Sequence, residues 1–320
     1  MRPAIATSLT VLAFALTACS AAPAADSAPL RVASLQGPTT MGLVHLIDQS
    51  DHQSAAQPYD FTIVGTPDAI SASLVAGNLD IALIPVNLAA VLYNKTDGGV
   101  KLAAVNTLGV LYIVSGDPAV TQLSDLAGRT VLSTGRGTTP QFVLDKVLSS
   151  SGLTSQVTVD YRSQATEVAS VLAVTPSDIA VLPEPYVTVS MAANPDIHIV
   201  ADLNDAWLQA TGSSLVTGCV AVRTAFADQH PASVAVFLTE YAASVAFTND
   251  HPDEVAPLIV AKNLAPSASV AVQAIPRAHI VYLTGDDAKQ AVSAYLNVLW
   301  AADPSSVGGA VPDGSFYYNT

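Results

Sequence analysis

The sequence predicts an α/β protein of two lobes, in which each lobe is a mainly parallel sheet flanked by helices. Short apolar runs that are typical of strands alternate with helical patterns from residue 30 to residue 201, and a βα series of this kind favours parallel pairing. A turn rich in Gly, Thr and Pro follows a strand at residues 37–42 and again at 133–140. Two long apolar runs, 101–114 and 215–223, suit a chain that leaves the first lobe and later returns to it.

The first lobe is expected to comprise residues 30–110 and 218–320. Its strands are predicted at 30–35, 60–64 and 81–84, and its helices at 40–49, 67–76, 88–94, 232–247, 253–262 and 286–300. The tail 307–318 should pack on this lobe as an extended strap, since it is rich in aromatic residues. The loops that follow the parallel strands should lie together, because ligands of open α/β sheets bind at the carboxyl ends of the strands.

The second lobe is expected to comprise residues 111–217. Its strands are predicted at 130–132, 157–161, 179–182 and 198–201, and its helices at 140–150, 166–173 and 186–193. Gly109 and Gly218 lie in the two crossings between the lobes. The predicted hinge is therefore a pair of strands near residues 109–112 and 217–220, a geometry that permits closure around a ligand.

Residues 1–19 differ in character from the rest of the chain. Their apolar run, 4–16, is shorter than the roughly 20 residues that a membrane-spanning helix needs, so the segment is predicted to be an export signal. Its ending, Leu-Thr-Ala-Cys, resembles the lipobox of bacterial lipoproteins, which implies that Cys19 becomes an acylated first residue. Residues 20–29 then suit a flexible tether. The alternative is a plain secretory signal that contains a cysteine.

The charge and the cysteine count exclude several classes of function. The chain carries 26 acidic and 12 basic side chains, a formal net charge of −14. Phosphate recognition needs clustered Lys and Arg, so nucleic acid is not expected as a partner. Cys219 lies in an apolar run and has no second cysteine to pair with if Cys19 is acylated. We therefore expect a buried, inert thiol rather than a disulfide or a nucleophile.

No pattern in the sequence indicates a catalytic or metal site. The six histidines lack the spacing of metal ligands, and no Gly-x-Ser-x-Gly elbow or P-loop is present. The pair Gly135 and Gly137 lacks the third glycine of a dinucleotide fingerprint. No catalytic residue, no metal and no cofactor are therefore predicted.

The candidate ligand-binding residues with neutral side chains follow strands in both lobes. Thr39 and Thr40 place hydroxyl groups beside the free backbone N–H groups of a helix start. Asn87 follows a strand of the first lobe and can both donate and accept hydrogen bonds. Thr138 and Thr139 are expected to face these residues from the second lobe. The alternative for each threonine-containing turn is an ordinary helix cap.

Three charged residues are further candidates. Glu184 stands between two prolines and either faces the ligand, where it would repel a bare anion, or caps the helix that follows. Arg277 and Arg136 are candidate counter-ions for an anionic ligand, because a guanidinium group binds a carboxylate or sulfonate through two parallel hydrogen bonds. The alternative for both arginines is an ordinary place on the surface.

Several segments have the order and spacing of a known family: Gly-Pro-Thr-Thr-Met-Gly-Leu at 37–43, Gly-Asn-Leu-Asp-Ile-Ala at 77–82, Pro-Val-Asn-Leu-Ala at 85–89, Leu-Tyr-Asn-Lys at 92–95, Leu-Pro-Glu-Pro at 182–185, Ile-Pro-Arg at 275–277 and the tail 307–318. Together they resemble the substrate-binding lipoproteins of bacterial ABC importers, in the branch that serves nitrate, taurine, aliphatic sulfonates and thiamine-pyrimidine precursors. The resemblance implies the two-lobe periplasmic-binding-protein fold (type II) with a two-strand hinge.

The same resemblance implies a function. The protein would be an extracytoplasmic, lipid-anchored monomer that binds a sulfonate, aromatic or pyrimidine-like compound and releases it to an ABC permease, without being an enzyme. One alternative is an enzyme of a related fold that acts on a pyrimidine-type metabolite, although the cysteine-rich segment known from such enzymes is missing here. A second alternative is a surface lipoprotein without a transport role, although no internal repeat is present.

Overall fold

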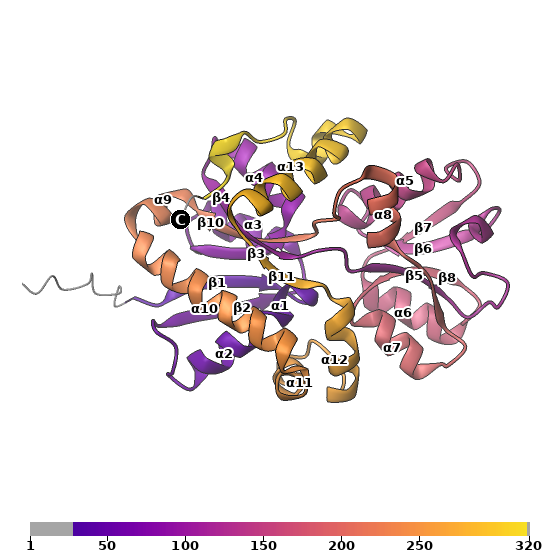
Figure 1. Cartoon of the computed structure of the whole chain (residues 1–320), viewed down its shortest axis with the longest axis horizontal. Coiled ribbons are helices and arrows are strands. Elements are labelled where there is room, and N and C mark those ends of the chain that lie inside the picture. The colour runs from indigo at the N-terminus through magenta and orange to yellow at the C-terminus, as the bar shows by residue number, and fades with distance from the viewer. Residues whose placement is uncertain (1–27, 319–320) are drawn as a thin grey trace, which may run out of the picture.

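The computed structural model describes residues 28–318 as two α/β lobes that lie side by side (Figure 1). The predicted signal segment 1–19, Cys19 and the predicted tether up to residue 27 lie outside the described residues. Lobe 1 contains a six-stranded sheet in the order β11-β4-β10-β3-β1-β2. Its strands are β1 (Leu30–Leu35), β2 (Tyr59–Val64), β3 (Ile81–Pro85), β4 (Val100–Thr107), β10 (Gly218–Arg223) and β11 (Ile280–Leu283).

Lobe 2 contains a five-stranded sheet in the order β7-β6-β8-β5-β9. Its strands are β5 (Leu111–Ser115), β6 (Thr130–Thr134), β7 (Thr158–Arg162), β8 (Ile179–Pro183) and β9 (His198–Asp202). The predicted α/β fold of two sheets flanked by helices is confirmed. Each sheet is mixed rather than mainly parallel, because β1 to β3 and β6 to β8 pair in parallel whereas β4, β5, β9, β10 and β11 pair antiparallel with their neighbours.

Helices cover both faces of each sheet (Figure 1). In lobe 1 these are α1 (Pro38–Met41), α2 (Val44–Asp51), α3 (Pro67–Val75), α4 (Val86–Lys95), α9 (Thr224–Gln229), α10 (Pro231–Asp250), α11 (Pro252–Ala261), α12 (Ala268–Ala274) and α13 (Gly285–Ala302), with short 3-10 turns η2 (Ile275–Arg277), η3 (Pro304–Val307) and η4 (Gly314–Phe316). In lobe 2 these are η1 (Leu123–Leu126), α5 (Thr139–Ser150), α6 (Ala165–Val174), α7 (Tyr186–Ala193) and α8 (Leu203–Thr211).

The predicted helix at 40–49 is broken into α1 and α2 at Gly42. A Cβ atom at Gly42 would lie 2.8 Å from Cγ2 of Ile280 and 3.1 Å from Cγ2 of Val245, both far away in sequence. The break therefore allows β11 and α10 to pack closely on this turn. Local periodicity contains no information about those two later elements, so a continuous helix was predicted.

The chain passes between the lobes at residues 108–110 and again through α8 and residues 212–217. The two crossings lie side by side, because the backbone N–H of Thr217 donates to the carbonyl of Thr107 at 3.0 Å. A Cβ atom at Gly109 would collide with the side chain of Asn204, and one at Gly218 with that of Asn106. Both glycines are thus needed for close approach of neighbouring segments.

Helix α10 is the one helix of the described residues that is long and apolar enough to cross a membrane by length and composition. Its residues Val234, Phe237 and Tyr241 are buried against lobe 1. This packing is that of a core helix of a folded domain. The tail that follows α13 also packs on lobe 1, since the backbone N–H of Tyr318 donates to the carbonyl of Leu102 at 2.8 Å, and the predicted packing of the tail is confirmed.

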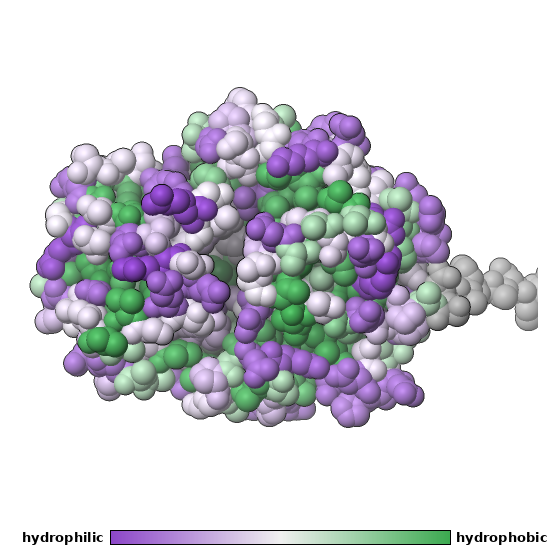
Figure 2. All heavy atoms as spheres, turned by 180° about the vertical axis from the view of Figure 1, so that it is seen from behind, coloured by the Kyte–Doolittle hydropathy of each residue, from purple (hydrophilic) through white to green (hydrophobic). Residues whose placement is uncertain are grey.

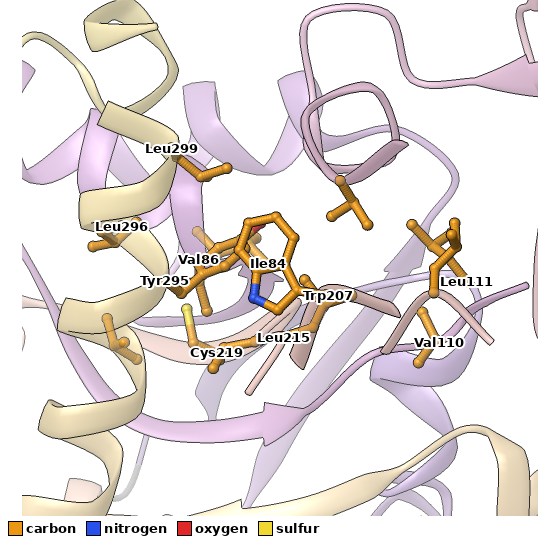
Figure 3. Packing of buried hydrophobic residues seen from close by; sticks show 14 of the residues in the cluster. Ile84, Val86, Val110, Leu111, Trp207, Leu215, Cys219, Tyr295, Leu296 and Leu299 are labelled. Atoms are coloured by element: carbon orange, nitrogen blue, oxygen red, sulfur yellow. The ribbon is translucent and has the colours of Figure 1, made fainter. Parts of the chain in front are cut away.

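One apolar core continues from lobe 1 into lobe 2 along α4, α5, α8 and α13. At its centre Trp207 of α8 is fully buried, and its ring centroid lies 5.5 Å from that of the buried Tyr295 of α13. Figure 3 shows Trp207 beside Tyr295, Leu215 and Cys219, with Val110 of the first crossing and Leu111 of β5 at the edge of the same cluster. The predicted burial of Cys219 is confirmed, and burial raises the pKa of its thiol.

Asp80 holds three strands of lobe 1 together at the end of the sheet where β1 and β3 begin. Its carboxylate is 3% exposed and accepts hydrogen bonds from Arg31 Nε and Nη2 at 2.9 and 2.6 Å and from Arg223 Nη2 at 3.0 Å. The backbone N–H of Arg31 also donates to it at 3.1 Å. Burial alone would raise the pKa of Asp80, but these hydrogen bonds outweigh burial and lower it.

We expect Asp80→Asn to lower the free energy of unfolding at neutral pH by about 2–3 kcal/mol. This is less than the roughly 3–5 kcal/mol typical of a broken buried pair, because both arginines are partly exposed. The lowered pKa makes the contribution of Asp80 fully present above its unfolded-state pKa of about 3.9, and it is lost as the pH falls through the folded-state pKa.

Urea unfolding between about pH 2.5 and 7 measures both effects. The exposed neighbour Asp60 provides the control Asp60→Asn, which should unfold much as the unaltered chain does. If Asp80→Asn kept the acid dependence of the unaltered chain, the assignment of that dependence to Asp80 would be wrong.

Candidate functional site

A cavity of about 280 Å3 lies between the lobes, where the first turns of three helices meet. Lobe 1 contributes the starts of α3 and α4 and the turn η3, and lobe 2 contributes the start of α5. The described residues that line it are Pro67, Asp68, Pro85, Asn87, Leu88, Val91, Gly137, Thr138, Thr139, Pro140, Phe142, Asp303, Ser305 and Ser306. Figure 2 shows that the molecule is hollowed where the two lobes meet.

Asn87 and Thr139 meet across this cavity from opposite lobes. The hydroxyl of Thr139 donates to Oδ1 of Asn87 at 3.1 Å, and Nδ2 of Asn87 donates to the carbonyl of Ser306 at 3.3 Å. The two side chains are 6% and 7% exposed. Tyr295 adds a long hydrogen bond of 3.5 Å to the hydroxyl of Thr139. Two residues that the sequence places in different lobes are thus in contact.

Thr138 lines the same cavity as the N-cap residue of α5. It is exposed, and its hydroxyl donates to the carbonyl of Gly135 at 2.8 Å. This bond closes the glycine-rich turn, and Gly135 and Gly137 adopt φ angles of 70° and 76°, which favour glycine. The turn therefore exposes Thr138 and presents the first residue of α5, Thr139, to lobe 1.

Thr39 and Thr40 differ in their surroundings although they are neighbours. Thr40 is fully buried, and its hydroxyl bonds to the carbonyl of Leu35 and to the hydroxyl of Ser34, the latter at 2.7 Å. Thr39 is partly exposed, and its hydroxyl makes no hydrogen bond within residues 28–318. Helix α1 is a single turn of four residues, so the dipole expected at its start is small.

Glu184 and Arg277 are paired with each other across the lobes. Glu184 follows β8 of lobe 2 and is fully buried, and its Oε1 accepts a hydrogen bond from Nε of Arg277 in η2 of lobe 1 at 2.5 Å. The hydroxyl and backbone N–H of Thr188 also donate to the Glu184 carboxylate, at 2.9 and 3.2 Å. Arg277 in turn bonds to Thr188, and its side chain remains 30% exposed. The two charges therefore neutralise each other locally.

The backbone around Arg277 is also tied to the first crossing. The hydroxyl of Tyr112 in β5 donates to the carbonyl of Arg277 at 2.8 Å, and burial raises the pKa of Tyr112. Arg136, the third charged candidate, is exposed in the glycine-rich turn before α5, with its guanidinium carbon 5.0 Å from the ring centroid of Tyr161. Neither Arg136 nor Arg277 lines the interlobe cavity.

Sequence reasoning missed the contribution of the C-terminal segment to the cavity. Ser306 and Tyr295 contact Asn87 and Thr139, although they lie more than 150 residues away from each partner. A run of small residues from 305 to 309 was the available signal, since small side chains allow a turn to approach α4 closely. Within the described residues, no group of three or more His, Cys, Asp or Glu side chains has the arrangement of a metal site.

Comparison with known proteins gives one family and many solved structures of the same fold. The model of the menaquinone biosynthesis family matches residues 30–299. A crystal structure of an ABC transporter from Parabacteroides distasonis has a TM-score of 0.76 and 25% sequence identity, covering 91% of this chain and 99% of that one. No curated protein matches the chain.

Two further structures share the fold at lower identity. The periplasmic aliphatic sulphonate binding protein SsuA from Escherichia coli has a TM-score of 0.72 at 13% identity, covering 91% of this chain and 92% of that one. The alkanesulfonate-binding protein SsuA from Xanthomonas axonopodis pv. citri, bound to MOPS, has a TM-score of 0.66 at 14% identity, covering 91% of this chain and 96% of that one. These likenesses support the periplasmic-binding-protein fold and do not extend to a shared ligand.

The match corrects one expectation drawn from the sequence. We expected that the protein is not an enzyme, and this expectation is wrong. The family whose model matches residues 30–299 is described as taking part in menaquinone biosynthesis, which points to an enzyme. The importer branch suggested by the sequence segments stays a prediction: sulfonate-binding proteins share the fold, whereas the family model that matches is a different one. Conversion of a bound molecule therefore has to be considered together with its capture.

Arg277→Met should lower the free energy of unfolding by about 3 kcal/mol, because it leaves the buried carboxylate of Glu184 without its cation. The double variant Arg277→Met with Glu184→Gln should recover at least half of this loss, since the charge is removed as well. Denaturant unfolding of the single and double variants measures both values. Arg129→Met, which breaks the exposed pair of Arg129 and Asp117, is the control and should cost less than about 1 kcal/mol. Equal loss in the single and double variants would contradict a buried charge as the cause.

Proposed function

The chain belongs to the menaquinone biosynthesis family, and from that premise together with its fold we propose that it captures a small, polar organic molecule in the cavity between its lobes. The observation that supports this most is the contact of Asn87 with Thr139, because it puts polar groups of both lobes at one cavity. A ligand there would replace or extend this contact, so its binding would depend on how closely the lobes approach. Hinge closure of this kind is common among two-lobe binding proteins.

We propose an uncharged ligand with N–H or O–H donors, such as a pyrimidine-like compound. The lining of the cavity includes the carboxylates of Asp68 and Asp303 and no Lys or Arg side chain among the described residues. A bare anion would be repelled there. Asn87 offers an amide, and Thr138 and Thr139 offer hydroxyl groups, so the neutral polar atoms of the site suit a molecule that both donates and accepts.

The predicted site residues then divide into two roles in this proposal. Thr138, Thr139 and Asn87 contact the ligand, since they line the interlobe cavity. Thr39 is assigned the same role because it is partly exposed and its hydroxyl makes no hydrogen bond within the described residues, although it does not line that cavity. Thr40, Glu184 and Arg277 do not contact the ligand in this proposal, because their polar groups are already used within the protein. Thr40 bonds to Ser34 and Leu35, and Glu184 and Arg277 bond to each other. Residues of the second group hold the strand ends and the relative position of the lobes.

The first candidate role is solute capture for an ABC importer. The Parabacteroides structure, which is described as an ABC transporter and has 25% identity over almost its whole length, supports this role. In the importer role, the protein works outside the cytoplasm as a monomer and releases its ligand to a membrane permease. In this proposal two bodies move relative to each other when the protein closes. One is lobe 1, residues 30–110 with 218–320, and the other is lobe 2, residues 111–217.

The second candidate role is catalysis of a step in menaquinone biosynthesis, which the family match favours. Both roles begin with the same binding step in the same cavity. They differ in what leaves the protein: the importer component releases its ligand unchanged, whereas the enzyme releases a product.

A ligand screen followed by product analysis separates these roles. Thermal-shift screening should include uncharged pyrimidines, aromatic acids, sulfonates and nitrate, because a ligand at 100 times its Kd stabilises the folded state by about 2.7 kcal/mol. We expect the uncharged pyrimidines to stabilise the protein and nitrate and sulfonates not to. Mass spectrometry after prolonged incubation of each hit then reports an unchanged ligand for capture and a new mass for catalysis.

Asn87→Ala should weaken binding of the best hit at least about 10-fold, because a buried ligand atom loses its hydrogen-bond partner. Calorimetric titration measures the change. Asn78→Ala is a matched control, since Asn78 is exposed and precedes β3 at the opposite end of the sheet from Asn87. Equal affinity of Asn87→Ala and Asn78→Ala would place the ligand elsewhere in the molecule.

We also propose that Cys19 carries the lipid that anchors the protein, as its Leu-Thr-Ala-Cys context suggests. A single acyl chain gives only marginal membrane attachment, so stable anchoring needs more than one chain. The intact mass of protein extracted from membranes should therefore correspond to a chain that begins at Cys19 with several acyl groups. A mature terminus at any other residue, or an unmodified Cys19, would disprove the anchor.

A further inference from the structure

A second, larger depression of about 960 Å3 lies between α5 and β7 of lobe 2 and the last turns of α13 in lobe 1, and we call it the α5–α13 groove. Its apolar wall includes Phe142 of α5 and Val298 of α13, which are half-buried and pack against the shared core. Tyr161 of β7 completes the wall. The groove has the size of sites that hold drug-sized organic molecules.

The sequence builds the wall on lobe 2 through two periodicities. Along the edge strand β7 and the residue before it, positions 157, 159 and 161 lie on one face, since side chains alternate along extended backbone, and all three line the groove. In α5 the residues at 142, 145, 146 and 149 lie on one helical face and line it as well. Asp160 and Arg162 point to the other face of β7, where they form an ion pair at 2.7 Å.

The charges at the groove balance. Asp145 and Asp303 line it with Lys146, and Arg136 stacks on the ring of Tyr161, which gives two negative and two positive groups. An ion of either sign therefore gains little from this environment, whereas an uncharged molecule does not lose the hydration of a net charge by entering it. The charge of the groove differs from that of the interlobe cavity, whose described lining residues include two carboxylates and no basic group.

The groove also has neutral polar lining residues, among them Gln141, Thr154, Asn297 and Tyr161. The hydroxyl of Tyr161 makes no hydrogen bond within residues 28–318, and burial raises the pKa of Tyr161 to about 12. The hydroxyl is therefore protonated at neutral pH and offers a hydrogen-bond donor toward the groove. Lys146 likewise makes no hydrogen bond or ion pair within the described part of the chain.

We propose that the α5–α13 groove is a second ligand site, for an uncharged, largely apolar ring compound with a carbonyl group that accepts a hydrogen bond from Tyr161. The aromatic walls suit a ring, the balanced charges suit an uncharged molecule, and the free hydroxyl suits an acceptor. Because α5 belongs to lobe 2 and α13 to lobe 1, the occupant contacts both lobes at once.

Prodan, an uncharged naphthalene with a propionyl carbonyl, is a direct probe because its emission shifts to the blue and rises in apolar sites. Titration of the full chain should show saturable binding of one molecule. Val298→Asp should weaken this binding at least about 10-fold, because it places a charge in the apolar wall. Tyr161→Phe should weaken it about fivefold, the usual effect of one lost hydrogen bond, with an unchanged melting temperature.

The matched control is Val174→Asp, since Val174 is 85% exposed at the end of α6 and lines no cavity described above. It should bind Prodan as the unaltered chain does. Absence of saturable binding, or equal binding by the Val298→Asp and Val174→Asp variants, would overturn the proposal. Equal binding by Tyr161→Phe and the unaltered chain would overturn the role of the hydroxyl. None of these outcomes depends on the ligand of the interlobe cavity, because Val298 and Tyr161 do not line it.

Discussion

The arrangement of the lobes depends on the apolar core that continues from one into the other. Trp207 is fully buried on the helix that leads back from lobe 2 to lobe 1, and it packs against Tyr295 of α13. This packing brings the start of α5 to the start of α4, where Thr139 meets Asn87. Loss of a fully buried indole typically costs about 3–5 kcal/mol. The lobes are thus joined by a hydrophobic cluster along α5, α8 and α13 as well as by two crossing segments.

The ion pair of Glu184 and Arg277 joins the lobes in a different way and restricts the chemistry of the site. A buried carboxylate is tolerated because one guanidinium and the hydroxyl and N–H of Thr188 surround it. The same pairing uses the charge of Arg277, which the sequence suggested as a counter-ion for an anionic ligand. Charge recognition of a ligand by Arg277 would have to compete with Glu184, whose Oε1 is 2.5 Å away.

Much of the fold could be predicted from the sequence because its signals are local. The alternation of apolar runs and helical patterns gave the order of strands and helices, and the end of β3 at Pro85 followed by α4 positioned Asn87 correctly. Thr39 and Thr40 show the limit of this reasoning. Both follow β1, yet Thr40 is buried and bonded to Ser34 and Leu35, whereas Thr39 is partly exposed, a difference between neighbours that no local signal indicates. The pairing of Glu184 with Arg277, 93 residues apart, has no local signal either.

The edge strand β7 has a consequence for the protein in concentrated solution. One side of β7 pairs with β6, and the backbone groups on its other side have no neighbouring strand in the described sheet. Free strand edges invite pairing between molecules, which can lead to aggregation. Asp160 and Arg162 place alternating charges on this strand, at 44% and 36% side-chain exposure. A second copy that paired here would have to desolvate both charges, so this edge is protected against self-association by the same alternation that directs Tyr161 to the opposite face.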